Sequence, residues 1–186
     1  MMRWTLWLSR AKIFDADYKF LIGKNRHPRV SILDPGIGVG GHCIAVDPWF
    51  LVSSCPESTK LIQTARRINM SRPAWVVSEI FDFVAQNFTD GKIKIACLGI
   101  TYKANVDDTR GSPAMTVIKC LIDAGFDVLS VDPNLSFHPK VKLHRLEDAL
   151  EECNLVVGLV SHREFINCSE LQTKIFLDFC GITAKK

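Results

Sequence analysis

The feature that most constrains the fold is an alternation of strand-like and helix-like segments between residues 92 and 179. Apolar runs typical of strands occupy residues 92–100, 126–131, 155–160 and 174–179. Helical patterns separate them at residues 112–125, 146–153 and 162–166. Because parallel strands need crossover connections, which helices usually supply, this order predicts an α/β fold with a parallel sheet covered on both faces.

A longer helical pattern precedes the alternating region. Apolar residues recur at three- and four-residue spacing from Glu57 to Phe88, as in an amphipathic helix. Pro73 lies inside this run and predicts a kink or a break near Ser71 and Arg72. The second half carries many large apolar residues, which favours packing against the sheet domain and also against another surface, such as a second subunit.

Composition excludes several classes of protein. The chain has 186 residues, of which 47% are hydrophobic, and a net charge of +3. This apolar content argues against disorder, and no apolar run reaches the roughly 18 residues of a membrane-spanning helix. Without a basic stripe, the charge argues against a nucleic-acid partner. A chain of this length needs no metal to fold.

The cysteines are consistent with a reducing compartment. Seven of them are scattered along the chain without a Cys-x-x-Cys pair. This pattern argues against a zinc ribbon, a redox motif or a secreted disulfide framework. We therefore expect a cytoplasmic protein without a bound metal.

Residues 36–41 match the pattern G-x-G-x-x-G. In a dinucleotide-binding fold, that motif joins a strand to a helix whose N-terminus holds the pyrophosphate. Here Pro48 interrupts, and the next good helical pattern starts near Glu57, so the context argues against NAD binding by this loop. The glycines indicate either a plain flexible loop or a backbone that approaches a ligand or partner closely.

Cys43 follows the glycine run, and Asp47 lies four residues later. A glycine-rich backbone can present a thiol to a ligand, and nearby amides can stabilise a thiolate or an oxyanion. The alternative is a buried structural cysteine, with Asp47 as a turn or cap residue before Pro48. His42 is adjacent to the cysteine, so its side chain tends to point elsewhere, and a Cys-His pair usually needs a histidine distant in sequence.

Two long motifs resemble a known family. Residues 40–51 resemble the catalytic-cysteine segment of the UDP-glucose/GDP-mannose dehydrogenase family, and residues 25–36 look like its bacterial UDP-N-acetyl-D-mannosamine dehydrogenase branch. The UDP-glucose branch usually has serine and lysine where this chain has His42 and Val46. Residues 99–114 resemble the signature that opens the family's C-terminal domain. The resemblance extends from about residue 24 to the C-terminus.

The resemblance implies three regions. Residues 1–55 are expected to be an N-terminal segment with the catalytic-cysteine loop, a remnant of the family's central domain. Residues 56–90 are expected to be a long linker helix that also forms a homodimer. Residues 91–186 are expected to be the C-terminal UDP-sugar-binding domain, a Rossmann-like parallel sheet.

The resemblance also implies a reaction. Family enzymes oxidise the C6 alcohol of a UDP-sugar to a carboxylate with two NAD-dependent hydride transfers, and here the substrate class would be a UDP-N-acetyl sugar used in polysaccharide biosynthesis. Cys43 matches the nucleophile that captures the aldehyde as a thiohemiacetal, which becomes a thioester and is hydrolysed. Asp47 matches the aspartate linked to water activation or proton handling.

Further positions match substrate-binding segments of the family. Lys103 matches a lysine that reaches the substrate, although it also fits a solvated lysine after a strand. Arg26 and His27 match a segment that reaches the neighbouring subunit's active site, or else form a charge pair at a helix C-terminus. Arg110 is expected to be structural. The remaining expected substrate-binding residues are Tyr102, Gly36, Gly38, Gly40 and Gly41.

The sequence also departs from the family pattern. The N-terminal NAD-binding domain and the family's catalytic lysine and asparagine have no recognisable counterpart. Asp132 mimics an NAD ribose acceptor, but the sheet region lacks the glycine motif, which favours a strand-end turn. We therefore expect the C-terminal part of such a dehydrogenase, inactive by itself. The alternative is a non-catalytic UDP-sugar-binding or dimerisation module. A free-standing cysteine hydrolase is disfavoured because no base partner is evident.

Overall fold

A computed structural model describes residues 36–89 and 92–183. Arg26 and His27 therefore lie outside the described residues. The strands are Lys94–Leu98 (β1), Asp127–Val131 (β2), Leu155–Gly158 (β3) and Phe176–Asp178 (β4). The α-helices are Asp47–Ser54 (α3), Lys60–Asn87 (α4), Pro113–Asp123 (α5), Leu146–Glu152 (α6) and Arg163–Ile166 (α7), with 3-10 turns at Pro56–Ser58 (η2) and Glu170–Thr173 (η3). The predicted alternation of strands and helices is confirmed.

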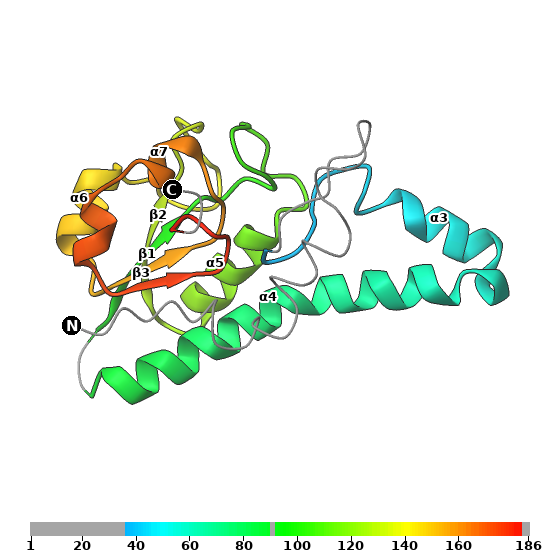
Figure 1. The fold of residues 1–186 in the computed structure, drawn as a ribbon, viewed down its shortest axis with the longest axis horizontal. Helices are drawn as coiled ribbons and strands as arrows, with labels where there is room; N and C mark the ends of the chain where they lie inside the picture. Colours follow the sequence, from blue (N-terminus) through cyan, green and yellow to red (C-terminus); the bar gives the residue numbers. More distant parts are fainter. Residues whose placement is uncertain (1–35, 90–91, 184–186) are drawn as a thin grey trace.

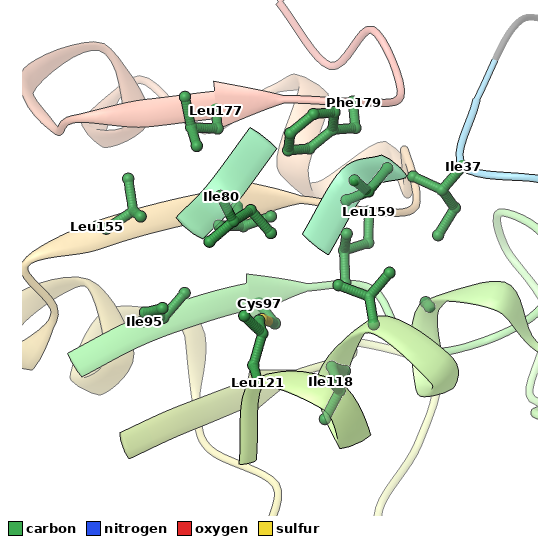
Figure 2. Close-up of a cluster of buried hydrophobic side chains, with 14 of the residues drawn as sticks. Ile37, Ile80, Ile95, Cys97, Ile118, Leu121, Leu155, Leu159, Leu177 and Phe179 are labelled. Atoms are coloured by element: carbon green, nitrogen blue, oxygen red, sulfur yellow. The ribbon is translucent and has the colours of Figure 1, made fainter. Parts of the chain in front are cut away.

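The four strands form one parallel sheet in the order β2-β1-β3-β4. Successive side chains of a strand point to opposite faces, and two apolar clusters result. Ile95 and Cys97 of β1 pack on the face covered by α4 and α5, which Figure 2 shows. Ala96 and Leu98 pack on the other face, beneath α6 and α7. Both faces are covered, so the predicted α/β class is confirmed.

Helix α5 begins where the sequence predicts. Ser112 is the N-cap, and its hydroxyl oxygen accepts a hydrogen bond from the Met115 amide at 3.4 Å. Pro113 fits the first turn because its missing N–H is not needed there. The Ser112 hydroxyl also donates to the Thr101 carbonyl at 3.1 Å. The start of α5 is thereby tied to the loop that leaves β1.

Helix α4 continues through Pro73 as one element of 28 residues, so, of the kink or break expected from the sequence, the break does not occur. Its buried residues Val76, Ile80, Phe83 and Val84 all lie beyond the proline and cover the sheet. The first half extends with α3 away from the sheet (Figure 1) and exposes apolar side chains such as Leu61 and Ile68. Within the described residues, no helix combines the length and apolarity that crossing a membrane requires.

Candidate functional site

A pocket of about 110 Å³ lies where β1, β3 and β4 end. In parallel sheets, the loops beyond these strand ends converge, and ligands commonly bind there. Gly36 and Gly38 line it from one side, and Tyr102 and Lys103 from the other, with Ser161 between β3 and α7. The pocket thus brings together four residues that the sequence marks as candidates for substrate binding.

The glycine loop is anchored to the sheet domain by Ile37. This side chain is buried in the cluster between the sheet and α4, and Figure 2 shows it beside Leu159. Burying an aliphatic side chain of this size contributes about 2 kcal/mol. Gly36 and Gly38 are held at the pocket because the residue between them is part of the core.

A second anchor uses the proline inside α4. Pro73 has no N–H, so the carbonyl of Asn69 four residues earlier lacks its helical partner. Gly38 packs over this carbonyl so closely that an added Cβ would lie 3.3 Å from its oxygen. The side-chain oxygen of Asn69 also accepts hydrogen bonds from the Val39 amide at 3.0 Å and from Arg66 Nη1 at 3.3 Å. The proline therefore opens a docking point for the loop instead of ending the helix.

A third anchor joins the glycine loop to the loop before α5. A Cβ at Gly40 would lie 2.3 Å from the Gly111 carbonyl oxygen and 2.8 Å from Pro113 Cδ. Gly41, at a φ of 89°, faces the ring of Tyr102, which would lie 2.9 Å from an added Cβ. Only glycine permits these approaches, so Gly40 and Gly41 serve close packing between the two loops.

Cys43 is exposed, which argues against the alternative of a buried structural cysteine. Its carbonyl accepts hydrogen bonds from the amides of Val46 at 2.9 Å and Asp47 at 2.8 Å, so the chain turns sharply into α3. Asp47 is the first residue of α3, and Val46 is the N-cap, so the aspartate is not the capping residue. Both candidate catalytic residues lie on one exposed turn just beyond the glycine loop.

Charged side chains surround this turn. Arg110 Nη2 bonds to Asp108 at 2.7 Å, and its Nε lies 3.0 Å from both Asp108 oxygens. Hydrogen bonds from Arg110 lower the pKa of the Asp108 carboxyl to about 2. His42 Nδ1 lies 4.0 Å from the same carboxylate. The pKa of Arg110 is raised chiefly by Asp108, with smaller contributions from Tyr102 and Cys43. A guanidinium therefore lies in the neighbourhood of the candidate nucleophile, which the sequence did not predict.

Lys103 is exposed at the rim of the pocket. Its Nζ lies 5.5 Å from the ring centroid of Tyr102, which is within range of a cation–π interaction. The Tyr102 amide donates to the Asp108 carbonyl at 3.0 Å and closes the intervening loop. The lysine therefore projects from a closed turn toward an open pocket.

Asp132 at the end of β2 is buried and already fully engaged. Its Oδ2 accepts hydrogen bonds from the amides of Ile100 at 2.8 Å and Thr101 at 3.2 Å and lies 3.2 Å from His162 Nε2. Burial opposes ionisation, but hydrogen bonds from His162 and the backbone outweigh it and hold the pKa of Asp132 below its usual value. Its Oδ1 accepts from the Asn134 amide at 3.0 Å, so both oxygens of this buried carboxylate bond to the protein itself, as in a strand-end structural group.

The described residues do not fit NAD. The glycine loop leads into a turn and the short helix α3, and the loop between β1 and α5 lacks the glycine motif. Asp132, the one ribose-acceptor candidate, bonds to the protein itself. Within residues 36–89 and 92–183, no group of three or more His, Cys, Asp or Glu side chains is placed to hold a metal ion. The seven cysteines, which all lie within the described residues, form no disulfide.

The parallel sheet, with helices on both faces and a pocket at its strand ends, makes this chain an α/β protein of the Rossmann-like class. A sequence model of the UDP-glucose/GDP-mannose dehydrogenase family, UDP binding domain, matches residues 96–185. A second model, for the central domain of the same family, matches residues 11–71. The chain belongs to the UDP-glucose/GDP-mannose dehydrogenase family.

Individual relatives agree with this family. The chain is 44% identical to a UDP-N-acetyl-D-mannosamine dehydrogenase of Campylobacter jejuni over 84% of this chain and 39% of the relative. It is 42% identical to an NDP-N-acetyl-D-galactosaminuronic acid dehydrogenase of Ralstonia solanacearum over 87% of this chain and 39% of the relative. A solved UDP-D-ManNAc dehydrogenase from Pyrococcus horikoshii superposes with a TM-score of 0.73 at 33% identity, over 92% of this chain and 42% of that one. The chain thus spans about two fifths of the length of its relatives.

Proposed function

We propose that this chain is the C-terminal part of an NAD-dependent UDP-sugar 6-dehydrogenase that acts on a UDP-N-acetyl sugar of the mannosamine type. One observation carries the proposal: the glycine loop, which leads into the turn with Cys43, packs through Gly41 against Tyr102, the neighbour of Lys103. A UDP-sugar bound at the strand ends has its sugar near a thiol and its charged part near a lysine. The oxidised sugar serves polysaccharide biosynthesis in the cytoplasm.

In this proposal, the pocket residues bind the nucleotide diphosphate. Lys103 supplies a cation for the phosphates, and an ammonium paired with phosphate forms a strong charge-assisted hydrogen bond. Tyr102 offers an aromatic face beside it. Gly36 and Gly38 leave room for the ligand to approach the backbone. Arg26 and His27 remain predicted substrate contacts from outside the described residues.

Cys43 acts on the aldehyde stage of the substrate. Its Sγ attacks the aldehyde carbon, a C–S bond forms, the carbonyl π bond breaks, and the thiol proton ends on the former carbonyl oxygen. Arg110 provides nearby positive charge for a thiolate. Asp47, one helical turn beyond the nucleophile, handles protons for water. NAD is the oxidant of the whole enzyme, and we assign its binding to none of the described residues.

We further propose that the exposed apolar side chains of α3 and of the first half of α4 pair with a second copy of the chain. They include Phe50, Leu51, Leu61, Ile68 and Met70. A gathering of large exposed apolar residues on one helical projection is typical of an interaction surface. The interface of the homodimer expected from the sequence would therefore be formed mainly by this projection, because the second half of α4 packs against the sheet.

Calorimetric titration with UDP tests the binding proposal. We expect the chain to bind UDP and the Lys103→Met variant to bind about tenfold more weakly or worse, as the loss of one charge-assisted contact predicts. Lys119→Met, which removes an exposed lysine on α5, is the matched control and should bind like the unaltered chain. A folded sample that binds no UDP refutes the proposal.

The alternative is a UDP-sugar-binding or dimerisation module without catalysis. It is favoured by the poor fit of NAD to the described residues. Incubating the chain alone with NAD and UDP-sugars should produce no NADH under either interpretation. Appearance of NADH absorbance would show that a complete active site forms without a further domain. Alkylation of Cys43 by iodoacetamide distinguishes a reactive thiol from an inert one.

A further inference from the structure

His162 is a fully buried histidine that neither motif contains. It precedes α7, just beyond β3, and its side chain is 0% exposed. Its ring packs edge-on against Phe165 with centroids 5.4 Å apart. A buried imidazole needs partners for both nitrogens, and the identity of those partners determines which nitrogen carries the proton.

The Nδ1 atom of His162 accepts a hydrogen bond. The backbone amide of Asn105 points at it from 3.1 Å, and a backbone N–H can only donate. The side-chain amide of Asn134 also lies 2.7 Å from the same nitrogen. Asn105 has a φ of 60°, a left-handed conformation that costs energy for most residues with a side chain. Its side-chain oxygen accepts from the Arg163 amide at 3.1 Å, so Asn105 is held in this conformation at two points.

The Nε2 atom of His162 donates. It lies 3.2 Å from Asp132 Oδ2, which is an acceptor when ionised, and 3.2 Å from the hydroxyl of Thr101. That hydroxyl donates its own hydrogen to the carbonyl of Lys103 at 2.9 Å, so toward the ring it can only accept. The contacts on both sides of the ring therefore specify the same species, a neutral imidazole with its proton on Nε2.

These contacts hold the backbone on either side of Lys103. The Lys103 carbonyl is fixed through Thr101, and the Asn105 amide, two residues later, is fixed directly. We infer that His162 is a positioning residue, which fixes the turn that presents Lys103 to the pocket and thereby sets the affinity for a nucleotide diphosphate. This inference rests on the proposed UDP-binding function for its consequence, but the control of the turn by His162 stands apart from it.

A double-mutant cycle distinguishes positioning from a general structural role. His162→Phe replaces the imidazole with a somewhat larger apolar ring that makes none of its hydrogen bonds, and it should weaken UDP binding about tenfold. In a Lys103→Met background, the same change should alter the affinity less than twofold, because the group being positioned is gone. An equal loss in both backgrounds overturns the inference.

Two conservative variants keep the test valid if the phenylalanine variant fails to fold. In His162→Asn, the side-chain oxygen lies near the position of Nδ1 and preserves an acceptor for Asn105. In His162→Gln, the amide nitrogen lies near the position of Nε2 and preserves only the donor to Asp132. Hydrogen exchange of the Asn105 amide should stay slow in the asparagine variant and become at least tenfold faster in the glutamine variant. Equal exchange in the two variants overturns the inference.

The exchange measurement needs no ligand, so it separates two kinds of failure. If the unaltered chain binds no UDP, the proposed function fails, and the exchange data still decide whether His162 controls the turn. If UDP binds but neither the affinities nor the exchange rates follow the pattern above, the binding proposal stands and the role of His162 is refuted.

Discussion

The two halves of the candidate site are built in different ways. Lys103 lies on a turn whose backbone is fixed by hydrogen bonds to buried groups, chiefly His162 and, through it, Asp132. Cys43 stands on an exposed turn, and its position depends on the glycine loop and on the projection formed by α3 and the first half of α4. The sheet domain therefore organises its half by itself, whereas the cysteine half depends on docking between surfaces.

The largest expected effect is on the free energy of unfolding, and it distinguishes the half of α4 that packs on the sheet domain from the half that projects with the cysteine turn. Ile80 is 0% exposed against the sheet, whereas Ile68, on the projecting half, is 62% exposed. Ile80→Ala should lower the free energy of unfolding by about 2–5 kcal/mol, because it removes a buried side chain and leaves a cavity. Ile68→Ala should lower it by less than about 0.5 kcal/mol. Chemical denaturation of both variants measures the contrast.

The same pair of variants tests the proposed dimer. If a second chain covers the projection, Ile68→Ala should weaken self-association in sedimentation experiments while the isolated chain stays equally stable. A large loss of stability in Ile68→Ala that is independent of protein concentration would contradict the division of α4 into a buried half and a projecting half.

The second prediction concerns the docking of the glycine loop. Gly40→Ala places a methyl group within 2.3 Å of the Gly111 carbonyl oxygen, so one of the two loops must move. We expect a loss of about 1–3 kcal/mol in the free energy of unfolding, as for other overpacked sites. Gly36→Ala is the control, since nothing lies within 4 Å of its added methyl group. Equal stability of the two variants would show that the loop is not docked in solution.

The sheet was predictable because its signal is local. Apolar runs of strand length alternate with helical patterns, and Ser112 followed by Pro113 is typical of a helix start. The order of the elements and the fold class can therefore be predicted from the sequence alone. Strand ends were expected up to two residues beyond their observed limits, because buried apolar residues such as Ile100, Leu159 and Val160 continue past the last ladder pairs. The break considered at Pro73 does not occur, and the glycine loop, which is distant in sequence, packs on the carbonyl that the proline leaves without a partner.

The candidate site was only partly predictable. The residues at the pocket came from a motif resemblance, because a lysine after a strand or a cysteine after glycines has no function on its own. His162 left no signal, since its importance comes from contacts with residues 57 to 61 positions away. Arg110 was expected to be structural, and it does pair with Asp108. Its nearness to Cys43 follows from loop packing that no spacing rule encodes.

A smaller expected effect concerns the titration of two carboxylates, Asp108 near the cysteine turn and Asp132 near the Lys103 turn. Asp108, beside the cysteine turn, has a pKa of about 2 because Arg110 bonds to it, and its folded pKa is therefore below its unfolded one. Arg110→Met should move that pKa up toward the ordinary value of 3.8, without changing the titration of Asp132. Above about pH 4, the stabilisation from this pair is fully present, and it should disappear as the pH falls through about 2.

Carboxyl titration by NMR checks this prediction. The stability difference between the unaltered chain and Arg110→Met should be constant near neutral pH and shrink in strong acid. A change in the Asp132 titration on removing Arg110 would mean that the two halves of the site are electrostatically coupled and do not form separately.

The last prediction concerns thiol chemistry. Cys43 and Cys55 are both exposed, whereas burial in the sheet raises the pKa of Cys97 to about 12. Iodoacetamide reacts with the thiolate, so Cys97 should stay unmodified in the folded chain. Cys43 should react faster than Cys55, because the guanidinium of Arg110 lies in its neighbourhood, and Arg110→Met should abolish that advantage. Mass spectrometry of time points measures all three rates. Equal rates for Cys43 and Cys55 in the unaltered chain would mean that exposure alone governs the cysteine turn and that docking against the sheet domain does not activate the thiol.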